Sequence, residues 1–228
     1  MKILAVETAT LAGSVALVED DRLLGEITLE LPRKHSERLI PSVEFLLGQL
    51  KVKPEELDGL AVDLGPGSFT GLRVGLAAMK GLAFSLNKPL VGVGSLEIMA
   101  ENLAAANGLL CPVLDARKGQ IFTALFRAKG SGRPERMSED WVLAPQELAA
   151  RIAEPVTLFG DGSRAYEAVF RETLGGRAQW AAPGVDAPRA FHCGRLARPR
   201  IEAGEGQDPD GLTPNYLRLS DAERLRAG

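Results

Sequence analysis

Residues 2–19 of the chain read KILAVETATLAGSVALVE, two apolar runs separated by a short turn. The first run ends in an acid, Glu7, and the second run resumes at Ser14. Short apolar runs bounded by turn residues predict two buried strands. A third extended segment at 23–31 follows a polar tip, so the chain is predicted to open with a three-stranded meander.

The same plan returns in the second half of the chain. Residues 109–115 form another apolar run that ends in an acid, and a second strand is predicted over 120–127. Later, each half has a strand, then Gly-x-Gly-Ser at 65–68 or 160–163, then a helix. Two coincidences in the same order predict a duplicated α/β unit, with two half-domains and a cleft between them.

The spacing of apolar residues between these motifs predicts the remaining strands and helices of both halves. In the first half we expect strands at 59–64 and 89–94 and helices at 36–50, 69–86 and 95–106. In the second half we expect a strand at 155–159, helices at 145–152, 164–174 and about 187–203, and loops at 128–139 and 175–188. The predicted division is a first half-domain of 1–106, joined by the C-terminal segment 207–228, and a second half-domain of 107–206.

Composition excludes several classes of protein. The 228 residues are 45% apolar and 25% charged, which is ordinary for a folded domain and argues against disorder, collagen or a coiled coil. The net charge of −3 argues against a dedicated nucleic-acid coat. No apolar run approaches a membrane span, and the N-terminus does not resemble a signal peptide, so we expect a cytoplasmic protein.

Cysteine and histidine are scarce. The two cysteines, Cys111 and Cys193, form no C-x-x-C motif, and Cys111 is predicted to be a small core residue. The two histidines, His35 and His192, lie too far apart for any His-x-x-x-His motif. We therefore expect no metal site, and we assign no catalytic residue.

A glycine-rich loop is the first candidate site. It contains Gly65, Gly67, Ser68, Thr70 and Gly71 between a predicted strand and a helix. Free N–H groups at a helix N-terminus favour an anion, and a hydroxyl of this loop is expected to cap the helix. The loop matches neither Walker A nor Gly-x-Gly-x-x-Gly. A structural turn and a phosphate or nucleotide contact both remain open.

The following helix, 69–86, carries only two charges, Arg73 and Lys80. Such a helix is buried on most sides, either within its own chain or against a partner. We predict that it forms a docking surface with the helix at 36–50. The residues predicted for this interface are Leu39, Val43, Leu46, Gly71, Gly75, Ala78, Met79 and Leu82.

Other charged residues have two interpretations each. Glu7 and Asp115 are either structural acids at strand ends or groups that position a nucleotide. The arginines near the C-terminus either form a solvated helix face or contact RNA phosphates; they are Arg189, Arg195, Arg198 and Arg200.

Four stretches together resemble a known family. They are ILAVETAT at 3–10, HSERLIP at 35–41, GPGSFTGLRVG at 65–75 and PNYLR at 214–218. The chain is similar, from residue 1 to about 225, to the bacterial TsaB (YeaZ) family, which is M22 glycoprotease-like. Residues 128–205 match that family only in outline.

The resemblance implies a duplicated ribonuclease-H-like fold of the actin-like ATPase (ASKHA) superfamily. It also implies a role in the synthesis of threonylcarbamoyladenosine (t6A) at position 37 of tRNA, as a non-catalytic subunit that binds the catalytic paralogue TsaD. TsaE, an ATPase, joins that complex. The family forms a homodimer when alone, contacts tRNA only indirectly and does not bind a membrane. No cofactor is tightly bound, and ATP or ADP is a candidate ligand at the interface with TsaD.

Three competing interpretations remain open from the sequence. They are an active ATPase or kinase of the same superfamily, an M22-type metallopeptidase, and a dimeric scaffold with no role in tRNA modification. The two distant histidines already argue against the metallopeptidase.

Overall fold

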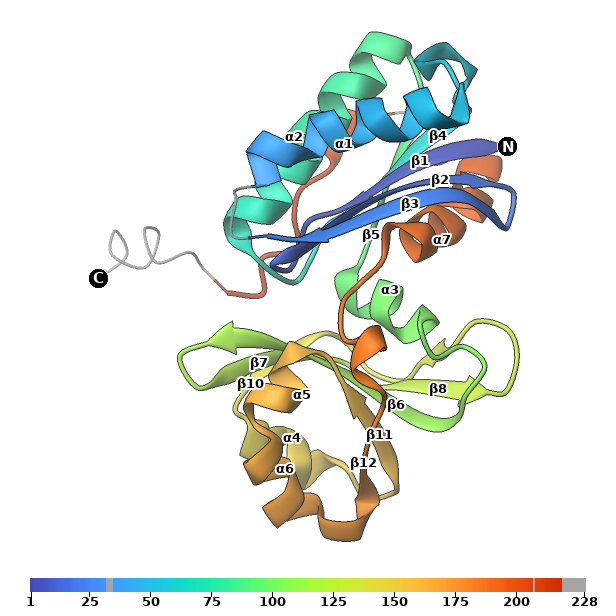
Figure 1. Cartoon of the computed structure of the whole chain (residues 1–228). Helices are drawn as coiled ribbons and strands as arrows, with labels where there is room; N and C mark the ends of the chain where they lie inside the picture. The colour runs from blue at the N-terminus through green and yellow to red at the C-terminus, as the bar shows by residue number, and fades with distance from the viewer. Residues whose placement is uncertain (32–34, 207, 219–228) are drawn as a thin grey trace. The chain divides into compact units, whose positions relative to one another are not determined.

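The computed structural model describes residues 1–31, 35–206 and 208–218, which form two compact units (Figure 1). The first unit contains Met1–Ile98 and Pro188–Asn215. The second contains Met99–Ala187 and the described residues from Tyr216 onward. No helix among the described residues is long and apolar enough to cross a membrane.

The first unit is built on a five-stranded sheet. Its strands are β1 (Lys2–Glu7), β2 (Ala12–Glu19), β3 (Arg22–Glu30), β4 (Gly59–Asp63) and β5 (Leu90–Val93). The order is β3-β2-β1-β4-β5, with β1, β2 and β3 antiparallel and β1, β4 and β5 parallel. The predicted opening meander is confirmed, and this order is that of a ribonuclease-H-like unit.

Helices cover both faces of this sheet. Alternation along β1 directs Leu4 and Val6 to one face and Ile3 and Ala5 to the other. The helices α1 (His35–Leu50) and α2 (Phe69–Leu86) pack on the first face, and α7 (Ala190–Glu202) packs on the second (Figure 1). Each face therefore has its own apolar core.

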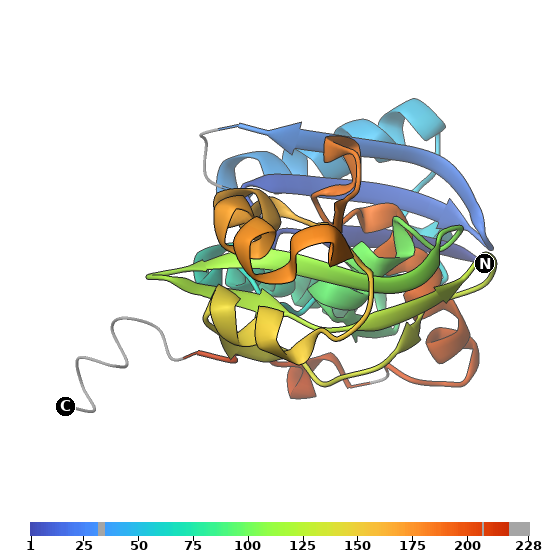
Figure 2. The same ribbon diagram turned by 90° about the horizontal axis from the view of Figure 1, so that it is seen from below.

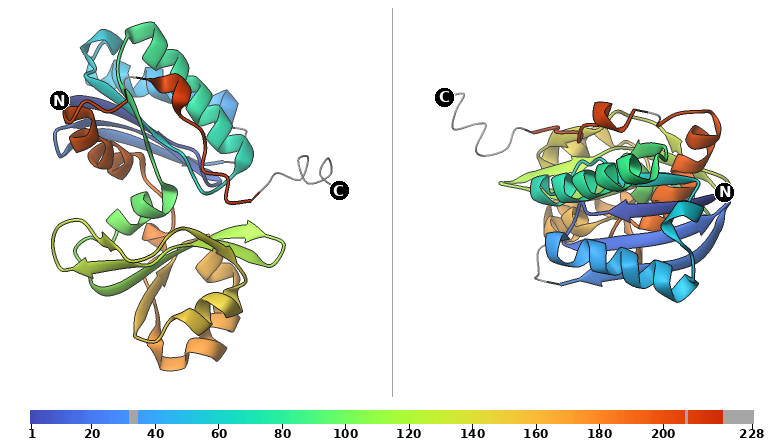
Figure 3. Two further views of the ribbon diagram at one scale, coloured as in Figure 1. Left: turned by 180° about the vertical axis from the view of Figure 1, so that it is seen from behind. Right: turned by 90° about the horizontal axis from the view of Figure 1, so that it is seen from above.

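The C-terminal segment as far as Asn215 also belongs to the first unit. It runs along α2 through the 3-10 turn Pro209–Gly211, where Lys80 Nζ donates to the Asp210 carbonyl over 3.0 Å (Figure 3). The Asn215 N–H then donates to the Leu64 carbonyl over 2.7 Å. Part of the cover that α2 needs is thus supplied by its own chain.

The place of α7 differs from the sequence-based division, which assigned 107–206 to the second half. The Ala190 N–H donates to Ser14 Oγ over 2.8 Å, so the helix begins against β2. A Cβ at Gly194 would lie 2.8 Å from Val18 Cγ2, so this glycine lets the helix approach the sheet closely. These contacts group 188–206 with the first unit. Of the C-terminal segment 207–228, residues 208–215 group with the first unit and residues 216–218 with the second, while 207 and 219–228 lie outside the described residues.

The second unit repeats the plan of the first. Its strands are β6 (Asn107–Arg117), β7 (Gln120–Thr123), β8 (Phe126–Lys129), β9 (Glu135–Arg136), β10 (Trp141–Leu143), β11 (Val156–Phe159) and β12 (Ala178–Trp180). The main path is β10-β7-β6-β11-β12, and the parallel and antiparallel senses match those of the first sheet. The duplicated α/β fold predicted from the sequence is confirmed.

Three helices accompany this second sheet: α4 (Pro145–Arg151), α5 (Asp161–Ala165) and α6 (Glu167–Leu174). The helix α3 (Ser95–Glu101) spans the boundary between the two units, which lies after Ile98. Side chains of α4 and α6 share one core with β6, β7 and β11. Figure 2 shows α4 to α6, in yellow to orange, lying over the strands.

Several element boundaries differ from the prediction. The strand predicted at 120–127 is interrupted at Ala124 and Leu125, because the Leu125 N–H donates to Ser138 Oγ; β7 and β8 nevertheless keep one register against β6. The loops predicted at 128–139 and 175–188 contain the short strands β9 and β12. Two- and three-residue strands carry too little periodicity to detect from sequence.

We predict that Gly75→Ala destabilises the first unit by about 1–3 kcal/mol, because the added Cβ would overlap Thr8 Oγ1 in the β1–β2 turn. The control is Gly81→Ala in the same helix, where an added Cβ meets nothing within 4 Å. This control should gain about 0.5–1 kcal/mol from helix propensity. Urea denaturation measures both changes, and equal effects of the two substitutions would contradict the packing described.

Candidate functional site

The glycine loop joins the carboxyl end of β4 to α2. Gly65 has a φ of +99°, a conformation that favours glycine, and its N–H donates to Asp63 Oδ1 over 2.7 Å. A Cβ at Gly67 would overlap the Ala9 carbonyl oxygen in the β1–β2 turn. The glycines therefore allow the loop to lie directly against that turn.

The loop already uses polar groups that an anion would need. The Ser68 N–H donates to the Ala9 carbonyl over 2.7 Å. The Ser68 hydroxyl accepts the Gly71 N–H over 3.2 Å, so Ser68 rather than Thr70 is the N-cap of α2. The structural interpretation of the loop explains these contacts, while the nucleotide contact stays a prediction.

Two acids are buried at the carboxyl ends of the strands that this loop adjoins. Glu7 ends β1 and Asp63 ends β4, and neither side chain is exposed to solvent. Burial raises the pKa of Glu7 well above its usual range, and the neighbouring Asp63 raises it further. Burial also raises the pKa of Asp63 to about 7. The sequence analysis missed Asp63, although an acid closing a buried strand was the signal that selected Glu7.

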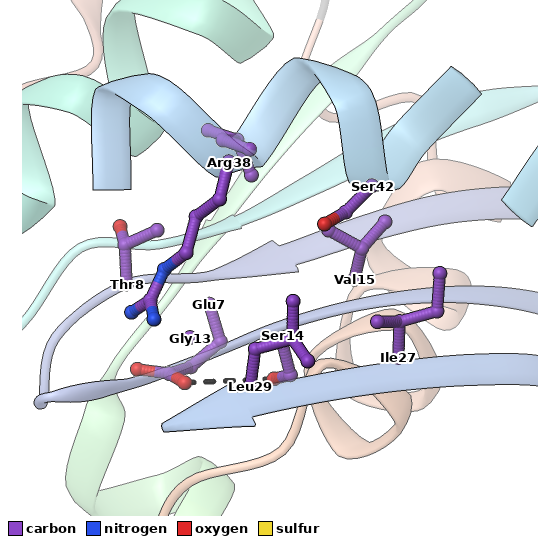
Figure 4. Close-up of a pocket in the computed structure, with 10 residues that line it drawn as sticks. Glu7, Thr8, Gly13, Ser14, Val15, Ile27, Leu29, Arg38 and Ser42 are labelled. Atoms are coloured by element: carbon purple, nitrogen blue, oxygen red, sulfur yellow. Dashed lines mark hydrogen bonds between the residues drawn. The ribbon is translucent and has the colours of Figure 1, made fainter. Parts of the chain in front are cut away.

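A small pocket adjoins Glu7 between α1 and the first three strands (Figure 4). It has room for about one water molecule. The Arg38 side chain descends from α1 toward it and donates to the Leu11 and Leu31 carbonyls. The pocket is lined by Glu7, Thr8, Gly13, Ser14, Val15, Ile27, Leu29, Arg38, Leu39 and Ser42.

Asp115 occupies the matching place in the second unit, at the carboxyl end of β6. Its carboxylate forms an ion pair with Arg117 over 3.0 Å and accepts the Arg117 N–H over 2.8 Å. Asp161 accepts the Asp115 N–H over 3.0 Å, and the Tyr166 hydroxyl lies 3.4 Å from Asp115. These contacts favour the structural interpretation of Asp115.

The cysteines and His192 are buried. Cys111 lies 3.2 Å from the Thr123 hydroxyl, and burial raises the pKa of its thiol to about 12. Burial lowers the pKa of His192 to about 4, so that imidazole is neutral at physiological pH. His35 is the first residue of α1. Over the described ranges, no three His, Cys, Asp or Glu side chains are placed to hold a metal ion.

The C-terminal arginines are paired within the first unit. Arg189 binds Glu26 of β3, and Arg198 binds Asp21 over 3.0 Å in the turn before β3. Arg195 Nε lies 3.7 Å from the same Asp21, and Arg200 binds Glu205 over 2.9 Å. The ion pairs of Arg189, Arg195 and Arg198 attach α7 to β3 and the turn before it, and Arg200 also donates to the Gly92 carbonyl of β5. The four arginines therefore have a structural role in this unit.

Comparison with known proteins supplies the family. The model described as "TsaD: tRNA N6-adenosine threonylcarbamoyltransferase" matches residues 23–224. A Bacillus subtilis protein named tRNA threonylcarbamoyladenosine biosynthesis protein TsaB is 33% identical over 98% of this chain and 96% of its own length. YeaZ from Pseudomonas aeruginosa superposes with a TM-score of 0.81 at 29% identity, covering 95% of this chain and 99% of that one. The chain belongs to the TsaB (YeaZ) family.

A more distant structure agrees on the fold alone. The component A of (R)-2-hydroxyglutaryl-CoA dehydratase from Acidaminococcus fermentans superposes with a TM-score of 0.52 at 9% identity, covering 89% of this chain and 99% of that one. Together with the duplicated strand order, these likenesses establish the ribonuclease-H-like, actin-like ATPase fold for this TsaB-family chain.

The predicted docking residues fall into two groups in this TsaB-family chain. Those that pack inside the first unit are Leu39, Val43, Leu46, Gly71, Gly75 and Met79. Ala78 and Leu82 are half-buried against the same core. The small residues Gly71 and Gly75 of α2 thus face inward, since Thr8 Oγ1 donates to the Gly71 carbonyl over 2.9 Å and Gly75 lies against Thr8.

Other residues of the same helices are exposed. On α2, Phe84 is 91% exposed; on α1, Phe45 is 60% and Ile40 is 41% exposed. Arg73 is also exposed and stacks 3.8 Å over the Phe69 ring. We call the exposed residues Thr70, Arg73, Ala77, Gly81 and Phe84 the outer stripe of α2. Most of the residues predicted for docking therefore lie on the inner faces of α1 and α2, and docking at these two helices stays a prediction.

We predict that Ser68→Ala destabilises the first unit by about 1 kcal/mol, because the Gly71 N–H loses its acceptor. Thr70→Ala, an exposed change in the same turn, should stay within about 0.5 kcal/mol of wild type. Chemical denaturation at equilibrium gives both values. An equal loss for the two variants would show that Ser68 is not the cap.

Proposed function

We propose that this chain is a non-catalytic subunit for t6A synthesis in the cytoplasm, and that it binds and supports the TsaD-type catalytic paralogue. The observation that carries the proposal is full-length similarity to a protein named for threonylcarbamoyladenosine biosynthesis, at 33% identity over 98% of this chain. The TsaE-type ATPase joins the complex, and tRNA contacts this chain only indirectly. Without its partner, the chain forms a homodimer.

The outer stripe of α2 and the exposed apolar residues of α1 support docking at this face. A phenyl ring that is 91% exposed costs free energy in water, and burial against a partner removes that cost. Ala77 and Gly81 lie beside Phe84 on the stripe and leave room for a partner helix. Phe45 extends the apolar surface onto the neighbouring helix.

The acids and N–H groups at the strand ends are buried or already bonded within the chain, which favours a non-catalytic role. Glu7 and Asp63 have no solvent exposure, and the Ser68 N–H is donated to the Ala9 carbonyl. Asp115 is bound by Arg117 in the second unit. Calorimetry of the isolated chain with Mg-ATP tests the competing ATPase or kinase, which requires measurable heat of binding.

We propose that no cofactor is tightly bound and that ATP or ADP contacts the loop Gly65–Gly71 only when the catalytic paralogue is present. Thr70 lies in the first turn of α2, and the backbone N–H groups of a helix's first turn favour an anion because they have no acceptor within the helix. Nucleotide titration of the complex tests this. Equal affinity for the wild-type and Ser68→Ala complexes would argue against a contact at the loop.

Depletion of the protein in its host tests the role in tRNA modification. We expect t6A in total tRNA to fall when the chain is depleted and to return when it is resupplied. Mass spectrometry of nucleosides from digested tRNA gives the t6A content. Unchanged t6A after depletion would refute the role and leave the dimeric scaffold as the better interpretation.

We predict that Phe84→Glu weakens binding to the catalytic paralogue at least tenfold, because the substitution places a charge in the proposed contact. Folding should be unaffected, since the ring is 91% exposed in the isolated chain. The control is Met137→Glu, an exposed apolar residue (50%) of the second unit, which should bind like wild type. Sedimentation of the mixed proteins measures the affinity, and equal affinity for all three proteins would exclude this face.

A further inference from the structure

Glu7 and Asp63 lie side by side on adjacent strands. The parallel pairing of Val6 with Val62 makes the next residue on each strand a neighbour of the other. Alternation places both carboxyl groups on the face covered by α7, the face of Ala5. Two acids are therefore enclosed together in the core of the first unit.

Their hydrogen bonds leave one oxygen without a donor. Glu7 accepts the Ala9 N–H over 2.6 Å and lies 3.5 Å from the Ser14 hydroxyl. Asp63 Oδ1 accepts the Gly65 N–H over 2.7 Å and the Ser95 hydroxyl over 2.6 Å. Asp63 Oδ2 is buried and has no hydrogen-bond partner within the described part of the chain. A buried acceptor of this kind is rare and costly in a folded protein.

The charged groups of the surrounding elements are engaged in other contacts. Arg189, the residue before α7, binds Glu26, and Arg198 on α7 binds Asp21. Arg200, also on α7, binds Glu205 and donates to the Gly92 carbonyl. On α1, Arg38 lines the pocket beside Glu7 and donates to two carbonyls.

The titratable groups near the pair are neutral or negative. Cys193 on α7 is buried, and burial raises the pKa of its thiol well above the usual range, with smaller contributions from Asp63 and Glu7. Glu97 of α3 acts on the same thiol in the same direction. His192, next to Cys193 on α7, is neutral because burial and two arginines lower its pKa.

We propose that Glu7 and Asp63 hold one proton between them at neutral pH, and that this proton supplies the hydrogen-bond donor that Asp63 Oδ2 lacks. The proton links β1 to β4 at the foot of the glycine loop. Its release to solvent leaves two negative charges in a core that excludes water, which weakens the first unit. The stability of the first unit where β1 and β4 end thus depends on pH through this pair.

The direction of the pH dependence follows from the raised pKa values. Both carboxyl groups have usual pKa values near 4 in the unfolded chain. The folded pKa is higher, to about 7 for Asp63, so the stabilisation is complete below the unfolded pKa and is lost as the pH rises through the folded pKa. One proton with a pKa of about 7 predicts that the unfolding equilibrium constant rises about tenfold between pH 6 and 8.

The experiment compares wild type with Glu7→Gln, whose amide N–H supplies the donor at every pH. We expect urea unfolding of wild type to show the tenfold rise between pH 6 and 8 and Glu7→Gln to lose it. Glu56→Gln is the matched control, because Glu56 is exposed and its pKa is lowered, so it should keep the wild-type profile. A wild-type profile that is flat, or a rise that Glu7→Gln retains, would overturn the proposal.

Infrared spectroscopy of the wild type keeps the test decisive if Glu7→Gln does not fold. We expect the C=O stretching band of a protonated carboxyl group at pH 6, which weakens as the pH rises through about 7. Absence of that band at pH 6 would overturn the proposal. Titration with Mg²⁺ at pH 8 tests whether a cation, rather than a proton, lies between the two carboxyl groups. A rise in melting temperature with Mg²⁺ that Glu7→Gln does not show would indicate the cation and overturn the proposal.

Discussion

The close contact between the glycine loop and the β1–β2 turn is the constraint on which the first unit depends. Gly67 lies against Ala9, and Gly75 lies against Thr8, at distances that no larger residue permits. This contact brings the start of α2 onto the sheet and sets which face of the helix is buried. The outer stripe of α2 is exposed because the opposite face of the helix packs on the sheet.

The same contact explains why the strand ends of this unit are closed. The loop uses the Ser68 N–H to bind the Ala9 carbonyl and the Gly65 N–H to bind the carboxylate of Asp63, and both Glu7 and Asp63 are buried. In the second unit, Arg117 closes the corresponding end by binding Asp115. The superfamily of this fold includes ATPases, but the blocked strand ends of this chain are compatible with a non-catalytic subunit. Its most distinctive surface is the exposed apolar residues of α1 and α2.

Much of the fold could be predicted from the sequence, because long periodic elements carry strong local signals. The helix 69–86 is confirmed with its bounds, and of the two hydroxyls that the sequence left open as its cap, Ser68 and Thr70, the structure selects Ser68. The short strands, the membership of α7 in the first unit and the role of Asp63 could not be predicted, because they depend on contacts between distant segments. The docking residues show the same limit. Small residues such as Gly71 and Gly75 allow close packing against either a sheet or a partner, and the sequence does not tell which of the two they contact.

Reconstitution of t6A synthesis from purified proteins tests the central claim most directly. The catalytic paralogue, the partner ATPase, tRNA and the threonylcarbamoyl donor are combined with and without this chain. We expect sustained t6A formation only when the chain and the catalytic paralogue are both present. Formation of t6A by this chain without the paralogue, or equal formation by the paralogue without this chain, would contradict the role of a supporting subunit.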